Sequence, residues 1–481
     1  QDPELMERFG VEIAKEWRAG GLHKLYGYMA DVASEPRWSR FNGTFGEDTD
    51  LVTEYIRATV TGMQGPELTD TSVACTIKHF PGGGVRLDGH DPHFEWGQTN
   101  EYPTEDSLSR YHLPPFQAAF DAGVSSVMPY YAKPVNSSAP QLPEADWFGP
   151  TAQFDEVAFA YNETFLCDLL RRQMRHGGYV NSDSGVIDAM YWGVEELTRP
   201  ERFARAIKAG TDVFSDMSDP AQLLVAVSEG LVGTADLDTA VSRLLSEIFA
   251  LGLFENPYVD EQAAGQVIGN AEVSALGQRA QRESVTLLRH DAALLPLDPS
   301  RPVRVFPYVT GRTKIDEVQG KLEAAIGTRW PGATVVDTPE EADLALVWAR
   351  PAIALFEDDR EGVSLSVDPR NNGVDVDRVR EIERAVPTIL LVNVTNPWLL
   401  GEIEPDAAAV VATFEITPEN LLASLAGEGG GPAGRLPLTM PVSAQAIADS
   451  PRDVPGKFLD DDYVYRDRDG VAYAYGHGLR F

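Results

Sequence analysis

Residues 176–183 read His176-Gly177-Gly178-Tyr179-Val180-Asn181-Ser182-Asp183 and join a predicted helix to a short apolar strand. The helix is predicted over 161–176, where leucine and phenylalanine side chains recur at i, i+4 spacing. The two glycines can take the left-handed conformation that ends a helix. Asp183 therefore stands where a strand ends, the position at which barrel enzymes mount catalytic groups.

The same succession of helix, small-residue break and apolar strand recurs through the first half of the chain. We predict five strands in this half, at 25–29, 73–77, 126–128, 179–180 and 212–214. Repeated units of this kind predict an α/β fold with a parallel sheet, whose carboxyl edge carries function. Five strands cannot close an eight-stranded barrel. We therefore expect either an open sheet or about three further units before Gln1.

The second half repeats the α/β pattern. Strands are predicted at 303–306, 344–348, 388–394 and 409–414. Between the halves, helices are predicted at 237–253 and 271–288, separated by a less regular connector that begins at Pro257. We expect one domain over residues 1–256, a linker over 257–297 and a second domain over 298–481.

Composition narrows the classes of ligand. The 481 residues carry a formal net charge of -34, so we expect neither nucleic acid nor an anionic membrane as a partner, but a neutral or cationic small molecule. Cys75 and Cys167 fall in a predicted strand and a predicted helix and are expected to be buried thiols. No apolar run is long enough to span a bilayer. The chain opens at Gln1 without an initiator Met or signal peptide, so the true N-terminus is expected to be absent, and cytoplasmic and secreted locations both stay open.

Several polar residues lie beside predicted strand ends. Lys78-His79 precede Pro81 and three glycines, a turn in which backbone comes close to whatever lies there. A Lys and a His at this place can hydrogen-bond vicinal hydroxyls; the alternative is a solvated strand end. Arg37 beside Trp38 offers a fork of donors and an aromatic wall, or else a structural salt bridge. Tyr130 is either a core aromatic or a contact to a sugar or a nucleophile.

Two acidic stretches complete the candidates. The loop 88–93 contains Asp88 and His90, which we expect to shape a binding site. A metal site and an Asp–His pair for proton transfer are the alternatives, and the spacing matches no metal motif. We expect no metal and no cofactor. Glu357 belongs to an acidic cluster at 357–361. Most such clusters are solvated surface, and this one matters because a glycosidase needs a second carboxylate. Asp183 is the expected nucleophile for attack on the anomeric carbon of a sugar.

Together these segments resemble glycoside hydrolase family 3, in particular its β-glucosidase-like members. The matching segments follow the family order along nearly the whole chain: Pro36-Arg37-Trp38-Ser39-Arg40, Phe45-Gly46-Glu47-Asp48, Lys78-His79-Phe80-Pro81-Gly82, Ser182-Asp183, Leu251-Gly252-Leu253-Phe254, Gly434-Arg435-Leu436-Pro437 and Tyr475-Gly476-His477-Gly478-Leu479.

The resemblance implies an N-terminal (β/α)8 TIM-type barrel, a C-terminal α/β sandwich and an active site between them. It implies retaining, exo-acting hydrolysis of a terminal β-linked sugar from a small β-glycoside or oligosaccharide. Asp183 would be the nucleophile and Glu357 the acid/base. The residues implied or expected to bind substrate are Arg37, Lys78, His79, Tyr130, Asp88 and His90.

The chain departs from the family pattern in three ways. Relatives have further barrel strands before the segment matching residues 2–5, so we expect the first strands to be absent here, and association with such a segment or homo-oligomerisation is open. Ser184 stands where many relatives have Trp. The acid/base varies across the family, and in the N-acetylglucosaminidase branch an Asp-x-His pair resembling Asp88-Gly89-His90 serves. The alternatives are therefore a β-N-acetylglucosaminidase, a β-xylosidase or a non-catalytic carbohydrate-binding protein.

Overall fold

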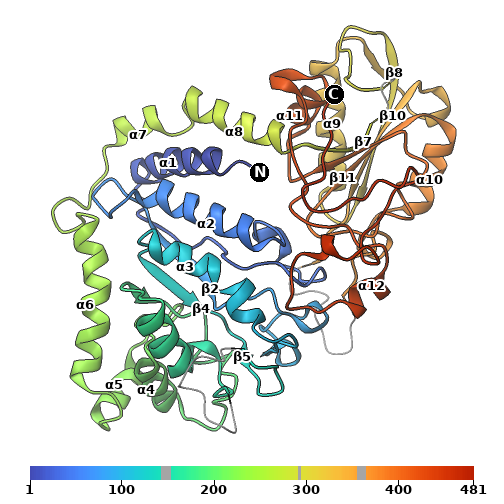
Figure 1. The fold of residues 1–481 in the computed structure, drawn as a ribbon. Coiled ribbons are helices and arrows are strands. Elements are labelled where there is room, and N and C mark those ends of the chain that lie inside the picture. Colours follow the sequence, from blue (N-terminus) through green and yellow to red (C-terminus); the bar gives the residue numbers. More distant parts are fainter. Residues whose placement is uncertain (142–152, 291–293, 355–364) are drawn as a thin grey trace.

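The computed structural model describes residues 1–141, 153–290, 294–354 and 365–481. Two separate sheets organise the chain, and Figure 1 shows them in different halves of the molecule, with α6, α7 and α8 leading from one to the other. The fold is of the α/β class, as predicted.

The first sheet is parallel. Its order is β1-β2-β4-β6, formed by Lys24–Leu25, Ala74–Phe80, Ser126–Pro129 and Tyr179–Val180. Isolated bridges extend it, since Met29 pairs with Lys78 and Asn181 with Val213. The chain therefore forms a β-strand or a β-bridge at each of the five places where the sequence predicts a strand. A separate two-stranded sheet joins β3 (Thr99–Asn100) to β5 (Lys133–Pro134).

Helices surround this sheet. They are α1 (Pro3–Ala19), α2 (Thr49–Gln64), α3 (Pro114–Asp121), α4 (Arg199–Ala209), α5 (Ala221–Ser228), α6 (Thr234–Ala250), α7 (Glu261–Val267) and α8 (Ala271–Ser284). Aspartates cap the starts of α1, α2 and α7: Asp2 accepts from the N–H of Leu5, Asp48 from that of Leu51 and Asp260 from that of Gln262. The helix predicted over 161–176 is a π-helix over Thr164–Gln173.

The second sheet has six strands in the order β7-β12-β11-β10-β8-β9, all parallel except β7. Its strands are Thr286–Arg289, Ala409–Thr413, Thr388–Asn393, Leu344–Arg350, Val303–Gly311 and Ala333–Val335, in that order. Helices α9 (Ile315–Arg329), α10 (Val376–Ala385), α11 (Pro418–Leu425) and α12 (Ala444–Asp449) accompany it. Buried apolar clusters cover both faces of this sheet.

One element differs from the prediction. The helix expected over 271–288 ends at Ser284, and Thr286–Arg289 form β7, antiparallel to β12. All four residues of this short run are buried, and a segment this short fits the periodicity of either a helix or a strand. Pairing with β12, more than a hundred residues away, decides between them.

The two halves are joined through buried polar contacts. Glu47 accepts hydrogen bonds from the backbone N–H of Thr439 (3.0 Å) and from its hydroxyl (2.7 Å). Asn396 donates to the carbonyls of Pro36 and Trp38, both at 2.9 Å. The loop that carries Trp38 and Arg40 is thus held from the second half of the molecule.

Replacing Glu47 by Gln should change how stability depends on pH. Burial raises the pKa of Glu47 from 4.5 to about 7, so the folded protein keeps a proton that the unfolded chain releases. The free energy of unfolding consequently falls as pH rises between these two values. E47Q should remove that decline, roughly 3 kcal/mol. Urea unfolding at pH 5 and at pH 8 measures it, and the same difference in both proteins would contradict the assignment.

Candidate active site

Asp183 lies just beyond the end of β6, two residues after the bridge at Asn181, as predicted. Its side chain is only 8% exposed. The N–H of Ser184 donates to Oδ1 (2.9 Å), whereas the buried Oδ2 finds no hydrogen-bond partner within the described residues. A buried carboxylate oxygen without a partner is costly and points to a functional role.

Lys78 lies close to this carboxylate. The pairing between β2 and β4 shifts register between Lys78 and Phe80, and such a bulge re-aims the side chains at a strand end. Burial lowers the pKa of Lys78, and the charge of Asp183 acts against that shift. The ammonium also lies 4.8 Å from the centre of the Tyr26 ring.

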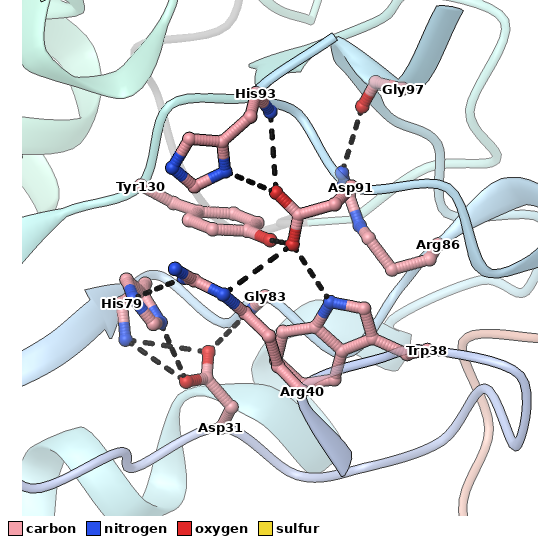
Figure 2. A network of polar contacts seen from close by, with 10 residues as sticks. All are labelled: Asp31, Trp38, Arg40, His79, Gly83, Arg86, Asp91, His93, Gly97 and Tyr130. Carbon is pink, nitrogen blue, oxygen red and sulfur yellow. Dashed lines mark hydrogen bonds and ion pairs between the residues drawn. The ribbon is translucent and has the colours of Figure 1, made fainter. Parts of the chain in front are cut away.

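His79 is held on both sides (Figure 2). Its Nδ1 lies 2.9 Å from Oδ2 of Asp31, and Nη1 of Arg40 lies 3.0 Å from its Nε2. A guanidinium can only donate, so Nε2 accepts and Nδ1 donates its proton to Asp31. Burial, the largest cause, lowers the pKa of His79 and favours this neutral ring. His79 therefore orients Arg40.

The glycine run after His79 is required by close approach. The N–H of Gly83 donates to Asp31, and a Cβ at this position would lie 2.9 Å from Oδ1 of Asp31. A Cβ at Gly84 would lie 1.9 Å from the carbonyl oxygen of Val32. The close backbone approach expected from the sequence is thus to Asp31 and its neighbours.

Two arginines of the loop after β1 have different surroundings. Arg37 donates to both oxygens of Glu35 (2.7 and 3.0 Å) and lies 3.2 Å from Asp88. Burial lowers the pKa of Arg40, but the charges of Asp91 and, further down, Asp183 outweigh this and raise it. The structure thus brings Arg40 into the field of Asp183, whereas Arg37 is engaged with Glu35 and Asp88.

The two tyrosines after β4 also have different contacts. Tyr130 is fully buried; its hydroxyl points to Asp91 (3.5 Å), and its ring centre lies 4.8 Å from that of His79. The Tyr131 hydroxyl donates to the carbonyl of Ser184 (2.6 Å). Burial and then the charge of Asp183 raise the pKa of Tyr131. Tyr131 is therefore the tyrosine that lies in the field of Asp183.

The loop 88–93 places its residues unevenly. The carboxylate of Asp88 is 56% exposed and pairs with Arg37, and His90 is half-buried. A hydrogen-bonded Asp-x-His pair lies three residues further on, between Asp91 and Nδ1 of His93. Asp91 was not among the predicted site residues, because no local feature of the sequence distinguishes it from Asp88.

Asp31 and Glu357 complete the inventory. Asp31 also escaped the sequence prediction, although it follows a strand end just as Asp183 does, and that shared position was the signal. Glu357 lies outside the described residues.

Within the described part of the chain, no three side chains of the metal-binding types gather into a group, and no helix has both the length and the apolarity needed to cross a membrane.

Known proteins resemble this chain along its whole length. The family described as Glycosyl hydrolase family 3 N terminal domain matches residues 1–247. A probable beta-glucosidase C from Aspergillus oryzae is 33% identical over 495 residues, which cover all of this chain and 71% of the relative. A periplasmic beta-glucosidase/beta-xylosidase from Dickeya chrysanthemi is 33% identical over 480 residues, which cover 94% of this chain and 69% of the relative.

The fold has counterparts among solved structures. Beta-glucosidase from Listeria innocua, solved with isofagomine, matches with a TM-score of 0.78 at 20% identity, over 100% of this chain and 69% of that chain. At this identity the likeness concerns the fold. Taken with the match over residues 1–247 and the full-length relatives, it leads to one conclusion: the chain belongs to glycosyl hydrolase family 3.

Proposed function

We propose that this glycoside hydrolase removes terminal, non-reducing β-linked glucose from small glycosides, with retention and through a covalent intermediate on Asp183. The observation that carries the proposal is the buried Oδ2 of Asp183, which has no partner among the described residues while Oδ1 is fixed by Ser184. The names of the two curated relatives support glucose as the sugar.

The chemistry would proceed in two steps. Oδ2 of Asp183 attacks the anomeric carbon as the glycosidic bond breaks, and water then displaces the sugar from the carboxylate. A second carboxyl group donates its proton to the leaving oxygen and later takes one from water. Glu357 remains our proposal for that group. Retention requires the two carboxyl groups to lie about 5 to 5.5 Å apart.

Lys78 and Arg40 are proposed to bind the sugar. Both are cations within the field of Asp183, and both can donate to hydroxyl groups. His79 would act by orienting Arg40, and Tyr131 by supporting the segment at Ser184. For Arg37, Tyr130, Asp88 and His90, we propose a role in shaping the loops around the site.

The first sheet is proposed to be part of a (β/α)8 barrel over residues 1–256. Its parallel strands alternate with helices, and the hydroxyl of Tyr26, just after β1, lies 3.4 Å from the hydroxyl of Ser215, just after the bridge at Val213. The second domain would be an α/β sandwich. Because β7 belongs to its sheet, we propose a linker shorter than 257–297.

A substrate panel tests the proposal. Purified protein should release p-nitrophenol faster from the β-glucoside than from the β-xyloside or the N-acetyl-β-glucosaminide, and NMR should show β-glucose as the first product. A preference for xyloside would favour the β-xylosidase alternative, for which the name of the Dickeya relative is the support. A preference for the N-acetylglucosaminide would favour the Asp-x-His alternative, and no turnover of any glycoside would exclude hydrolysis.

Arg40 and Arg37 should respond differently to replacement by Ala. Arg40→Ala should lower kcat/KM by about 10- to 100-fold, the loss expected for one or two charged hydrogen bonds. Arg37→Ala leaves the buried Glu35 unpaired, so it should lower the melting temperature. Its kcat/KM, measured well below the transition, should stay within about threefold. Equal kinetic losses in both variants would contradict the placement of the two arginines.

A further inference from the structure

Asp91 is a buried carboxylate that touches several residues around the proposed sugar site (Figure 2). Its side chain is fully buried. Oδ2 accepts hydrogen bonds from Nε1 of Trp38 (3.3 Å) and from the Tyr130 hydroxyl (3.5 Å). Oδ1 accepts from the backbone N–H of His93 (3.2 Å) and pairs with its Nδ1.

The same carboxylate fixes Arg40. Nε of Arg40 lies 3.6 Å from Oδ2 of Asp91, while Nη1 donates to Nε2 of His79 at 3.0 Å. The guanidinium is thus held by an ion pair with Asp91 and by a hydrogen bond to His79. An arginine side chain has many rotamers in solution, and two fixed partners select the one in which its remaining N–H groups point in a defined direction.

Asp91 also reaches the other side of the site through His93. The His93 ring stands edge-on to Tyr131, with 4.6 Å between ring centres, and Tyr131 donates to Ser184 beside the nucleophile. Burial opposes the charge of Asp91, but the hydrogen bond from His93 and the charge of Arg40 keep its pKa below the ordinary value. The carboxylate therefore stays charged at neutral pH.

We propose that Asp91 is a positioning residue for sugar binding, which acts by holding the Arg40 guanidinium toward the bound glycone. The inference rests on the proposed function, since it takes Arg40 to bind the sugar. Asp91 itself need not touch the substrate.

Asp91→Asn is the first variant to measure. The amide keeps the shape of the side chain but removes the charge. It also places an NH2 donor where the carboxylate accepted hydrogen bonds, so that this donor faces the donors that contact Asp91. We expect kcat/KM for p-nitrophenyl β-glucoside to fall by about 10- to 100-fold. Most of this loss should appear as a higher KM and not as a lower kcat, because the contacts of Asp183 are unchanged. The inhibition constant of gluconolactone, a flat-ring sugar mimic, should rise by a similar factor.

A double-variant cycle shows whether Asp91 acts through Arg40. In the Arg40→Ala background, Asp91→Asn should lower kcat/KM by no more than about threefold further, because the group that it positions is already gone. The matched control is Glu404→Gln. Glu404 is also fully buried and accepts from Arg289, Tyr465 and Tyr473, but in the second half of the molecule. This control should lose stability and keep its KM.

Several outcomes would overturn the inference. They are a folded Asp91→Asn protein with wild-type KM, or losses that multiply in full in the double variant. If Asp91→Asn does not fold, Tyr130→Phe serves instead, since it removes one donor to Asp91; it should raise KM a few-fold in the wild type and not in the Arg40→Ala background. If the wild-type protein itself has no β-glucosidase activity, the proposed function is rejected, and this result is distinct from the outcomes that reject the role of Asp91.

Discussion

Asp183→Ala should abolish hydrolysis of β-glucosides while the protein keeps its fold. We expect kcat to fall by at least about 10⁴-fold, because the covalent route is lost and water has no equivalent position. The melting temperature should hold or rise, since the variant loses a buried carboxylate oxygen that lacks a partner. Steady-state kinetics and thermal unfolding of the same preparation measure the two effects.

Two further observations make this test specific. Azide should restore turnover of Asp183→Ala with an activated substrate and yield the α-glycosyl azide, because azide then attacks from the face that the carboxylate occupied. A 2-deoxy-2-fluoroglucoside with a good leaving group should transfer its fluoroglucosyl group to Asp183 of the wild type, with release of the aglycone, and the mass of that glycosyl group should be absent from the variant. Asp188, on the same loop and 42% exposed, is the control, and Asp188→Ala should remain active. Labelling at another carboxylate would reject Asp183 as the nucleophile.

Glu357→Gln should have the second largest effect, and its size should depend on the leaving group. General acid catalysis contributes about 10²- to 10⁴-fold. A poor leaving group such as the second glucose of cellobiose needs that proton, so kcat/KM should fall by about 10³-fold. A dinitrophenolate leaves without a proton, so formation of the glycosyl-enzyme from 2,4-dinitrophenyl β-glucoside should change little.

Azide again gives a distinct product. With Glu357→Gln it should accelerate turnover and yield the β-glycosyl azide, since it attacks the intermediate from the side of the missing base. Glu361→Gln, in the same acidic cluster, is the matched control and should behave as the wild type. Equal rates for wild type and Glu357→Gln on cellobiose would move the acid/base role to another residue, and His93 would then be the first one to replace.

Local patterns were sufficient for the strands of the first parallel sheet, for four strands of the second sheet and for the position of Asp183. Short apolar runs after glycine breaks predicted the places where strands form, because a strand's periodicity and the glycines that precede it are properties of neighbouring residues. The same reasoning placed Lys78 and His79 at the carboxyl edge. It failed for residues 286–289, where a strand far along the chain supplies the pairing.

The amino-acid sequence by itself determined the α/β class, the strand ends that carry Asp183 and Lys78, and the family resemblance. Only the tertiary structure distinguishes nearby side chains that look equivalent in the sequence, and its contacts are the basis on which we propose Arg40 over Arg37, Tyr131 over Tyr130 and Asp91 over Asp88 for the site. In each pair the residues have similar chemistry and stand one to three positions apart. What separates them is the partner supplied from another strand end, such as His79 for Arg40 or Ser184 for Tyr131. Such partners are set by the packing of the whole sheet and leave no local trace.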